Sequence, residues 1–465
     1  MEVNEILVLA MFGSFILLLF TGVPVAWVLG GVGVIFAMVG YLADIYLDTF
    51  TGLDMTTLGL VVNRIYKIMD NWILVALPMF IYMGIMLDKS GVAERLMDAM
   101  QDMFGKVSGG LAITVTCIGI ILAASTGIIG ASVVLLAVMS LPAMQKQGYH
   151  MPLALGTIAS AGTLGILIPP SIMLVIMADQ LGLSVGDLFM GAVFPGLILG
   201  TLYITYILLV GWFKPHYAPV PEDAQSPDWS VLWRVIKSVF PTLLLIFMVL
   251  GSIFAGIATP TEASGVGALG ATLLAAYNGK LKLSVVKDAL NGTYNTTAYI
   301  FAIFIGATCF ALVLRELGGD ELIESFLTGL PFGPYGIILF ILGIIFLLGF
   351  FLDWIEITLI VLPLLAPVIS ALGLDINGYG VVDNPELVWF VMLVAMALQT
   401  SFLTPPVGFA LFYLKGVCPP GVKLTDIYKG VAPFIVLQLI GMFALLAWPE
   451  VSLWLPAVAY GSGPG

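Results

Sequence analysis

The chain has 465 residues, of which 60% are hydrophobic and 9% charged, and its mean hydropathy is +1.12. Long, repeated apolar runs in such a composition are typical of a polytopic α-helical membrane protein, and they exclude a soluble fold. The net charge of −12 indicates little about partners, because the few charged residues lie in loops and at a small number of special positions.

Apolar segments alternate with short polar loops along both halves of the chain. They lie at 6–20, 24–42, 72–88, 107–147, 152–180 and 187–212, and again at 232–256, 261–277, 292–315, 334–371, 387–414 and 426–448. The fourth segment of each half is too long for one crossing, so we interpret 107–147 and 334–371 as re-entrant helical hairpins with polar tips. Each half then has five crossings, and an odd number inverts the second half relative to the first.

The two halves repeat one another. Pro-Pro pairs at 169–170 and 405–406 are 236 positions apart inside long apolar segments, and Pro24 and Pro260 have the same offset. A prolyl pair breaks a helix, and broken helices at matching points of two inverted halves indicate a transport site. The sequence predicts an all-α polytopic membrane protein of two inverted-topology repeats, each with a re-entrant hairpin and a Pro-Pro-broken helix.

Basic residues test this topology, because cytoplasmic loops collect Lys and Arg. With the N-terminus outside, most of them fall on inner loops: Lys89, Arg95, Lys106, Lys146, Lys214, Arg234, Lys237, Lys280, Lys282, Lys287, Lys415, Lys423 and Lys429. Only Arg64, Lys67 and Arg315 fall outside. The pattern predicts that both termini lie outside the cytoplasm.

Two amphipathic segments, at 87–104 and 314–330, each lead into a hairpin. We interpret them as arms that join a moving hairpin domain to a fixed scaffold, with an interfacial helix on the bilayer as the alternative. The predicted domains are a first repeat at 1–212, a cytoplasmic linker at 213–231, a second repeat at 232–448 and a C-terminal tail at 449–465. Within the repeats, the scaffold helices precede the arms, and the broken helices are 152–180 and 387–414.

Small and hydroxylated residues gather at the hairpin tips and the breaks, where carbonyl and hydroxyl oxygens suit sodium and helix termini suit an anion. The predicted sodium ligands are Ser125, Thr126, Gly127, Gly130, Ser132, Gly165, Gly349, Asp353, Thr358, Thr400 and Ser401. The predicted substrate-binding residues are Ser160, Thr163, Pro169, Pro170, Thr404, Pro405 and Pro406. The alternative is that these small side chains only let helices approach closely.

Ionisable residues inside membrane segments are costly and indicate function. Asp353 at the second tip is the leading side-chain candidate for sodium, and Glu356, one turn later, could replace it. Glu262 follows Pro260 in the first turn of a helix, where the helix dipole stabilises a carboxylate without any further role.

Several ordered motifs resemble the large membrane subunit of a tripartite ATP-independent periplasmic (TRAP) transporter. They are GVPVA at 22–26, ALPMFIYMGIMLDKSGVAERL at 76–96, GYHMPLALGTIASAGTLGILIPPSIMLVI at 148–176, FPG at 194–196, TPTEA at 259–263 and TPPVG at 404–408. The resemblance implies an elevator-type ion-transporter fold and sodium-coupled uptake of a small organic anion such as a dicarboxylate. It also implies a bacterial or archaeal inner membrane, a small four-helix membrane subunit and a periplasmic substrate-binding protein. The chain departs from the family in its GASV at 130–133, where relatives have a more serine-rich GSSVA, and in the long loops 43–71 and 213–230.

Other function classes lack their sequence features. There is no GxSxG, HExxH or nucleotide-binding GxxxxGK[ST], so an enzyme and a primary pump are disfavoured, and nothing indicates a nucleic-acid partner. The remaining alternative is a stand-alone sodium-coupled carboxylate carrier of the same broad fold. Which organic anion is carried, and with how many sodium ions, does not follow from the sequence.

The topology can be tested with single cysteines and an impermeant thiol reagent. We expect cysteines at Asp223 and Lys282 to be labelled only from the cytoplasmic side, and those at Asp48, Asp320 and Asp383 only from outside. An inverted pattern would contradict the basic-residue argument. A mixed pattern, with some positions on the expected side and others on the opposite side, would show that a predicted hairpin is a crossing.

Overall fold

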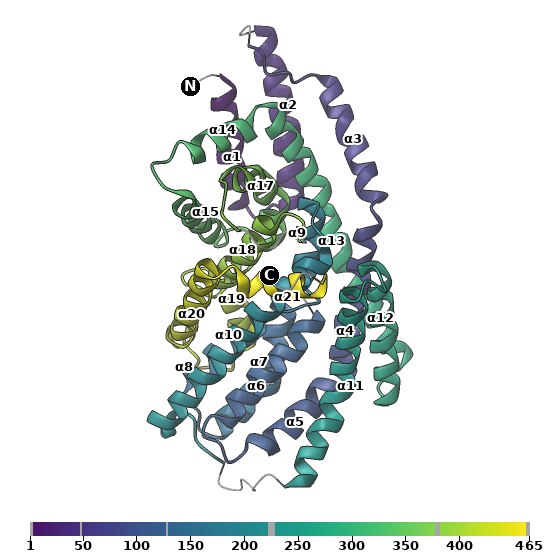
Figure 1. The fold of residues 1–465 in the computed structure, drawn as a ribbon, viewed down its shortest axis with the longest axis vertical. Coiled ribbons are helices and arrows are strands. Elements are labelled where there is room, and N and C mark those ends of the chain that lie inside the picture. The colour runs from purple at the N-terminus through teal and green to yellow at the C-terminus, as the bar shows by residue number, and fades with distance from the viewer. Residues whose placement is uncertain (1–2, 47–48, 127–128, 222–227, 377–381, 462–465) are drawn as a thin grey trace.

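The computed structural model describes residues 3–46, 49–126, 129–221, 228–376 and 382–461, and this part of the chain is helical without a β-strand. Long helices are stacked into an elongated body, with α3 (Met55–Met69) along one side and the C-terminal helix α21 (Glu450–Ala459) near its middle (Figure 1). The described residues thus confirm the predicted all-α class.

The first half contains a hairpin followed by a broken helix, as predicted. Its elements are α1 (Val3–Leu19), α2 (Val25–Tyr46), α3, η1 (Trp72–Val75), α4 (Ala76–Lys89), α5 (Val92–Phe104), α6 (Gly110–Thr126), α7 (Ile129–Lys146), α8 (Met151–Thr163), η2 (Leu164–Ile166), α9 (Ile172–Leu181), α10 (Val185–Phe213) and η3 (Pro215–Tyr217).

The second half repeats this order. Its elements are α11 (Trp229–Phe254), α12 (Pro260–Tyr277), α13 (Leu283–Glu316), α14 (Gly319–Thr328), α15 (Pro334–Leu348), α16 (Trp354–Glu356), the π-helical η4 (Ile357–Val361), α17 (Leu362–Ala371), α18 (Pro385–Leu403), α19 (Phe409–Val417), α20 (Leu424–Ala447) and α21.

Helices of the two halves pair crosswise to form one body, the scaffold. Helix α2 packs along α13, and its counterpart α12 packs along α4. Both contacts depend on small residues: a Cβ on Gly306 would lie 2.3 Å from the Ala26 carbonyl oxygen, and one on Gly267 would lie 2.6 Å from Met83 Sδ. This exchange of equivalent partners is the arrangement expected of two inverted repeats.

The hairpins and broken helices form a second body, the hairpin bundle. In it α6 and α7 pack against α8, α15 packs against α18, and α10, α20 and α21 cover the outside. Helix α18 is buried along almost its whole length. Helices surrounded by other helices on all sides belong to the interior of a helical bundle, so α18 lies in the centre of this body.

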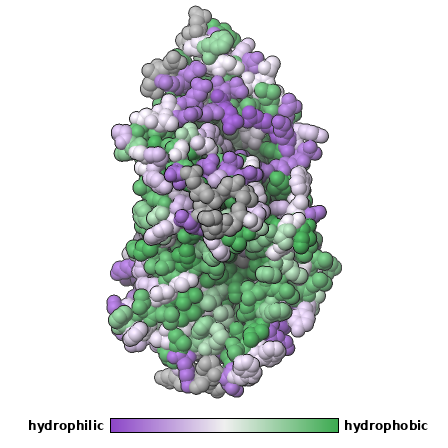
Figure 2. All heavy atoms as spheres, viewed as in Figure 1, coloured by the Kyte–Doolittle hydropathy of each residue, from purple (hydrophilic) through white to green (hydrophobic). Residues whose placement is uncertain are grey.

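Hydrophobic residues gather over the lower part of the face in Figure 2, and hydrophilic residues gather towards the top. Among the described residues, nine helical stretches are long and apolar enough to cross a membrane, two of which are the hairpin segments Ile129–Lys146 and Trp354–Ala371. The composition and these stretches identify a membrane protein.

Three regions differ from their sequence-based description. The predicted loop 43–71 contains the end of α2 and the amphipathic helix α3, whose N-terminus is capped by Asp54 accepting from the Thr57 N–H (2.9 Å). The predicted loop 213–230 contains η3, and residues 222–227 lie outside the described part. The predicted tail 449–465 contains α21, which packs on α10 through buried side chains such as Leu453. Short amphipathic helices were missed because their apolar runs are shorter than a membrane crossing.

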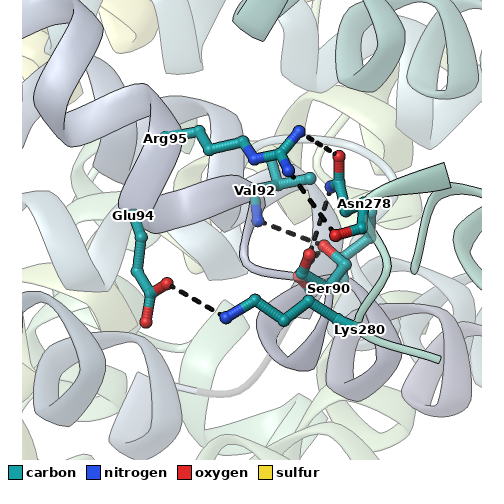
Figure 3. Close-up of polar contacts among 7 residues, drawn as sticks. Ser90, Val92, Glu94, Arg95, Asn278 and Lys280 are labelled. Atoms are coloured by element: carbon teal, nitrogen blue, oxygen red, sulfur yellow. Dashed lines mark hydrogen bonds and ion pairs between the residues drawn. The ribbon is translucent and has the colours of Figure 1, made fainter. Parts of the chain in front are cut away.

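Helix α5, in the predicted first arm, contacts both bodies through α6 and α11. It follows a left-handed glycine, Gly91 (φ 71°), and Gly318 (φ 78°) occupies the same place before α14. Figure 3 shows how the start of α5 is attached to the loop between α12 and α13: Arg95 Nη1 donates to Asn278 Oδ1 (2.6 Å), and Asn278 Nδ2 donates to the Ser90 carbonyl (3.1 Å). The division of the chain into arms, repeats and linker remains a prediction.

Within the hairpin bundle, α8 and α20 approach at Gly156 and Gly430, where a Cβ on Gly156 would lie 2.1 Å from the Gly430 carbonyl oxygen. Because backbone atoms can yield only if the helices separate, we expect Gly156→Ala to cost about 1–3 kcal/mol or more and to lower the melting temperature of the purified protein. Gly265→Ala is the control, since nothing lies within 4 Å of its Cβ position. Equal melting temperatures of the two variants would show that the α8–α20 contact tolerates a methyl group at Gly156.

Candidate functional site

The first helix break lies between η2 and α9. Residues 167–171, which include Pro169 and Pro170, connect the two, and Ser171 Oγ donates to the Ile166 carbonyl (2.6 Å). Proline has no N–H to continue a helix, so carbonyl groups are left without intrahelical partners here. The break is almost entirely buried in the hairpin bundle.

The second break has the same construction. Helix α18 ends at Leu403 and α19 begins at Phe409, with Pro405 and Pro406 between them. Tyr428 Oη of α20 donates to the Pro406 carbonyl (3.0 Å), and Gly408 has a positive φ of 50°. Both Pro-Pro peptide bonds are cis.

Hairpin one meets the first broken helix through small residues. The Cβ position of Gly119 on α6 is 2.7 Å from Ala161 Cβ, and that of Gly162 on α8 is 2.5 Å from Val133 Cγ2 of α7. Helices this close leave no room for larger side chains at the contact. At the tip, Gly127 and the side chains of Ser125 and Thr126 lie outside the described part of the chain, and Ser132 is buried in α7.

Hairpin two meets the second broken helix directly. Ser401 Oγ donates to the Phe346 carbonyl of α15 (2.7 Å), and a Cβ on Gly349 would lie 2.6 Å from that hydroxyl oxygen. The structure therefore brings together Gly349 and Ser401, as the sequence predicts for this pair.

The predicted threonines are buried or half-buried and donate to carbonyl oxygens of their own helical segments: Thr163 to Ser160, Thr358 to Trp354, Thr400 to Met396 and Thr404 to Thr400. A hydroxyl that donates still has lone pairs, so each oxygen could also coordinate a cation. Ser160 Oγ is buried and has no hydrogen-bond partner among the described residues. Gly165 is buried in η2, at the end of α8.

A cavity of about 210 Å³ is lined by residues of both hairpin tips and of the scaffold. Gly130 of hairpin one and Asp353 of hairpin two both line it, together with Val25 and Tyr299 of the scaffold and Tyr413 of α19. The Gly130 Cβ position is only 3.0 Å from the Tyr413 ring, so the first tip rests on the helix that follows the second break.

Two carboxylates occupy this cavity. Asp353 Oδ1 accepts from the Trp354 N–H (2.8 Å) and caps the short helix α16. Glu356 is 1% exposed, and its Oε2 has no hydrogen-bond partner among the described residues. A buried carboxylate without a partner is unfavourable, so the arrangement requires a cation, a proton or a hydrogen-bonding ligand.

The cavity does not contain all of the predicted site. Ser160, Thr163, Pro169 and Pro170 are absent from its described lining, as are Thr358, Thr400, Ser401, Thr404, Pro405 and Pro406. Thr358 lies in hairpin two, and the other residues lie in the breaks and in the helices that lead into them. Phe409, the residue directly after the second break, is part of the lining, so the cavity adjoins that break.

Sequence reasoning missed the aromatic walls of the cavity. Tyr299 comes from the middle of α13 and Tyr413 from α19, and Phe409 begins α19. Tyr413 follows the TPPV motif by about two helical turns, which is a weak signal, whereas Tyr299 has none because it lies far away in the chain.

Glu262 lies outside the described lining of this cavity and has a structural partner. Its Oε2 accepts from both the N–H and the Oγ1 of Thr259 at 2.8 Å, which forms a capping box at the start of α12. This geometry is the one expected of a first-turn carboxylate that stabilises a helix N-terminus.

Residues 12–451 match the sequence model of a family described as "Tripartite ATP-independent periplasmic transporter, DctM component". The chain is 30% identical over 394 residues to the C4-dicarboxylate TRAP transporter large permease protein DctM of Pseudomonas aeruginosa, covering 84% of this chain and 88% of that protein. It is 29% identical over 451 residues to the sialic acid TRAP transporter large permease protein SiaM of Vibrio cholerae, and this match covers 96% of this chain and 97% of that protein.

Among solved structures, the crystal structure of the Alcanivorax borkumensis YdaH transporter is similar in fold, with a TM-score of 0.63. The match covers 87% of this chain and 91% of that chain at 13% sequence identity. At this identity the likeness concerns the fold alone.

The role of Asp353 can be tested by following sodium-dependent thermal stabilisation of the purified protein. Asp353→Asn keeps an oxygen that can cap α16 but loses the charge, so we expect the sodium concentration for half-maximal stabilisation to rise about tenfold, or about 1.4 kcal/mol. Stability without sodium should change little.

The matched control is Glu262→Gln, which removes the charge of an exposed capping carboxylate. We expect a slight loss of stability and an unchanged sodium midpoint. If Asp353→Asn titrates like the wild type while Glu262→Gln does not respond to sodium, the ion binds near α12 and the assignment is wrong.

Proposed function

We propose that this chain, which belongs to the family of large membrane components of TRAP transporters, imports a small organic anion of the carboxylate class by sodium-coupled secondary transport. As a member of a permease family it is a transporter component and not an enzyme. The observation that carries the proposal is the cavity between the hairpin tips.

Charge explains why sodium is the proposed coupling ion. The described lining of the cavity has two carboxylates and no Lys, Arg or His. An organic anion entering beside Asp353 and Glu356 would meet like charge in a poorly solvated space, which is costly unless cations compensate it. Hydroxyl and carbonyl oxygens at the tips and breaks suit such a cation, so sodium and the anion would support each other's binding.

The size of the cavity favours a small solute. About 210 Å³ is below the volume of pockets that hold drug-sized ligands. The relatives carry C4-dicarboxylate and sialic acid in their names, and a carboxylate of this kind is the proposed substrate class here. Its anionic group would be held by sodium, helix termini and backbone N–H groups at the breaks.

The division into two bodies supports an elevator mechanism. The scaffold and the hairpin bundle are connected through α5 and α14, each of which begins after a left-handed glycine. We propose that the bundle moves against the scaffold around these glycines and carries the tip cavity from one side of the membrane to the other. The proposed location is a bacterial or archaeal inner membrane with both termini outside.

The proposed partners are a small four-helix membrane subunit and a periplasmic substrate-binding protein, in agreement with the tripartite description of the family. The alternative is a stand-alone sodium-coupled carboxylate carrier of the same fold. The mass of the complex purified with the products of neighbouring reading frames distinguishes the two.

The function can be tested in vesicles that contain the purified membrane complex. With the binding protein and an inward sodium gradient, we expect uptake of a labelled C4-dicarboxylate or of sialic acid without ATP. Equal uptake after collapse of the gradient would contradict sodium coupling. Uptake that does not need the binding protein would favour the stand-alone carrier.

A further inference from the structure

A second cavity lies in the hairpin bundle, where α8 and α20 begin and α10 ends. Its volume is about 520 Å³. It is lined by the end of α10, by η3 and by the first turns of α8 and α20, which pack against one another at Gly156 and Gly430. Gly430 of this close helix contact is itself part of the lining.

One end of this cavity is basic. Lys214 and Lys429 both line it, and neither forms an ion pair in the described part of the chain. The one carboxylate of the lining, Asp426, accepts from the Lys423 N–H (3.2 Å) at the start of α20. Two unpaired ammonium groups beside one capping carboxylate leave a surplus of positive charge.

Aromatic rings hold the basic end in place. The His150 ring is stacked on Tyr217 (centroids 4.1 Å apart, 11° between planes), and Lys214 Nζ is 5.1 Å from the centre of the same ring. The backbone N–H of His150 also donates to the Tyr217 carbonyl (2.9 Å). Burial lowers the pKa of His150, and the Asp426 carboxylate offsets this only in part. The lysines therefore supply the charge.

The other end is apolar and continues onto the outer surface of α10. Leu209 is 45% exposed and Phe213 76% exposed, four residues apart on one face, and both line the cavity. Next to them Trp212 is 81% exposed. Aromatic residues at the last turn of a membrane helix, followed at once by Lys214, are typical of the membrane–water interface.

We propose that this cavity binds one phospholipid with an anionic headgroup, whose phosphate contacts Lys214 and Lys429 and whose acyl chain runs along Leu209 and Phe213. The basic end matches the charge of the headgroup, and basic pockets between membrane helices bind such lipids. The apolar end favours a lipid over a free anion, because an acyl chain can pack against Leu209 and Phe213 and a free anion cannot. The lipid would connect the ends of α8, α10 and α20 as the bundle moves.

The test uses the purified full-length protein in detergent, with lipid binding followed by native mass spectrometry and by thermal unfolding. We expect phosphatidylglycerol to form a one-to-one adduct and to raise the melting temperature, and phosphatidylcholine to do neither, because a ligand that binds only the folded state stabilises it. In the variant Lys214→Gln/Lys429→Gln we expect about a tenfold weaker affinity for phosphatidylglycerol.

The control Lys282→Gln/Lys287→Gln makes the same change of charge outside the described lining of the cavity and should bind like the wild type. Equal binding of both lipids, or unchanged affinity in the Lys214/Lys429 variant, would overturn the proposal. Stabilisation by inorganic phosphate alone would also overturn it, because that outcome indicates a site for a soluble anion.

Hydrogen exchange on the wild-type protein gives an independent measurement: phosphatidylglycerol should slow exchange at 209–217 and 424–430, and protection elsewhere would contradict the site. None of these measurements depends on transport.

Discussion

Two interruptions of the helical backbone inside a hydrophobic body are the constraint on which the rest of this structure depends. At 167–171 and 404–408 the chain is not helical, and each unpaired backbone group would cost several kcal/mol in lipid. The breaks must therefore be enclosed by protein. Ser171 and Tyr428 each donate to a carbonyl there, at Ile166 and Pro406, and the hairpins supply the remaining cover. The near-complete burial of α8, α9 and α18 is the consequence.

Because the two helix breaks are enclosed by protein, only certain residues fit at the contacts between the hairpins and the broken helices. A hairpin covers a broken helix closely only where side chains are small, as at Gly119 against Ala161 and Gly349 against Ser401. The two interpretations of the small and hydroxylated residues are thus compatible. Ser401 holds hairpin two through the Phe346 carbonyl, and its oxygen still has a lone pair for a cation. Close helix packing requires small side chains at these positions, and a small hydroxylated side chain can also offer an oxygen to a cation.

The two cavities have charged side chains of opposite sign. In their described linings, the tip cavity has Asp353 and Glu356 without a basic residue, and the cavity at the ends of α8, α10 and α20 has Lys214 and Lys429 with one acid. In a membrane protein each such group must find a counter-charge or water. We propose sodium for the first and an anionic lipid headgroup for the second. Helix α5, the predicted first arm, packs on α6 and α11 through a buried apolar face that includes Leu96 and Met100, and its exposed contact from Arg95 to Asn278 contributes little further stability.

The sequence by itself determined the membrane class, the inverted halves, both hairpins and both breaks, because these depend on local properties: apolar length, proline chemistry and a repeat offset. It also predicted that Glu262 has a structural role in the first turn of a helix, since a carboxylate directly after a helix-starting proline is a local pattern. The helical character of 55–69 and 450–459 was missed, since such short amphipathic segments give no membrane-length signal. Only the tertiary structure decided that Gly130 meets Tyr413, and that Tyr299, Asp353 and Phe409 line one cavity between the two bodies. These contacts join residues far apart in the chain, and no local propensity specifies how two inverted repeats interlock.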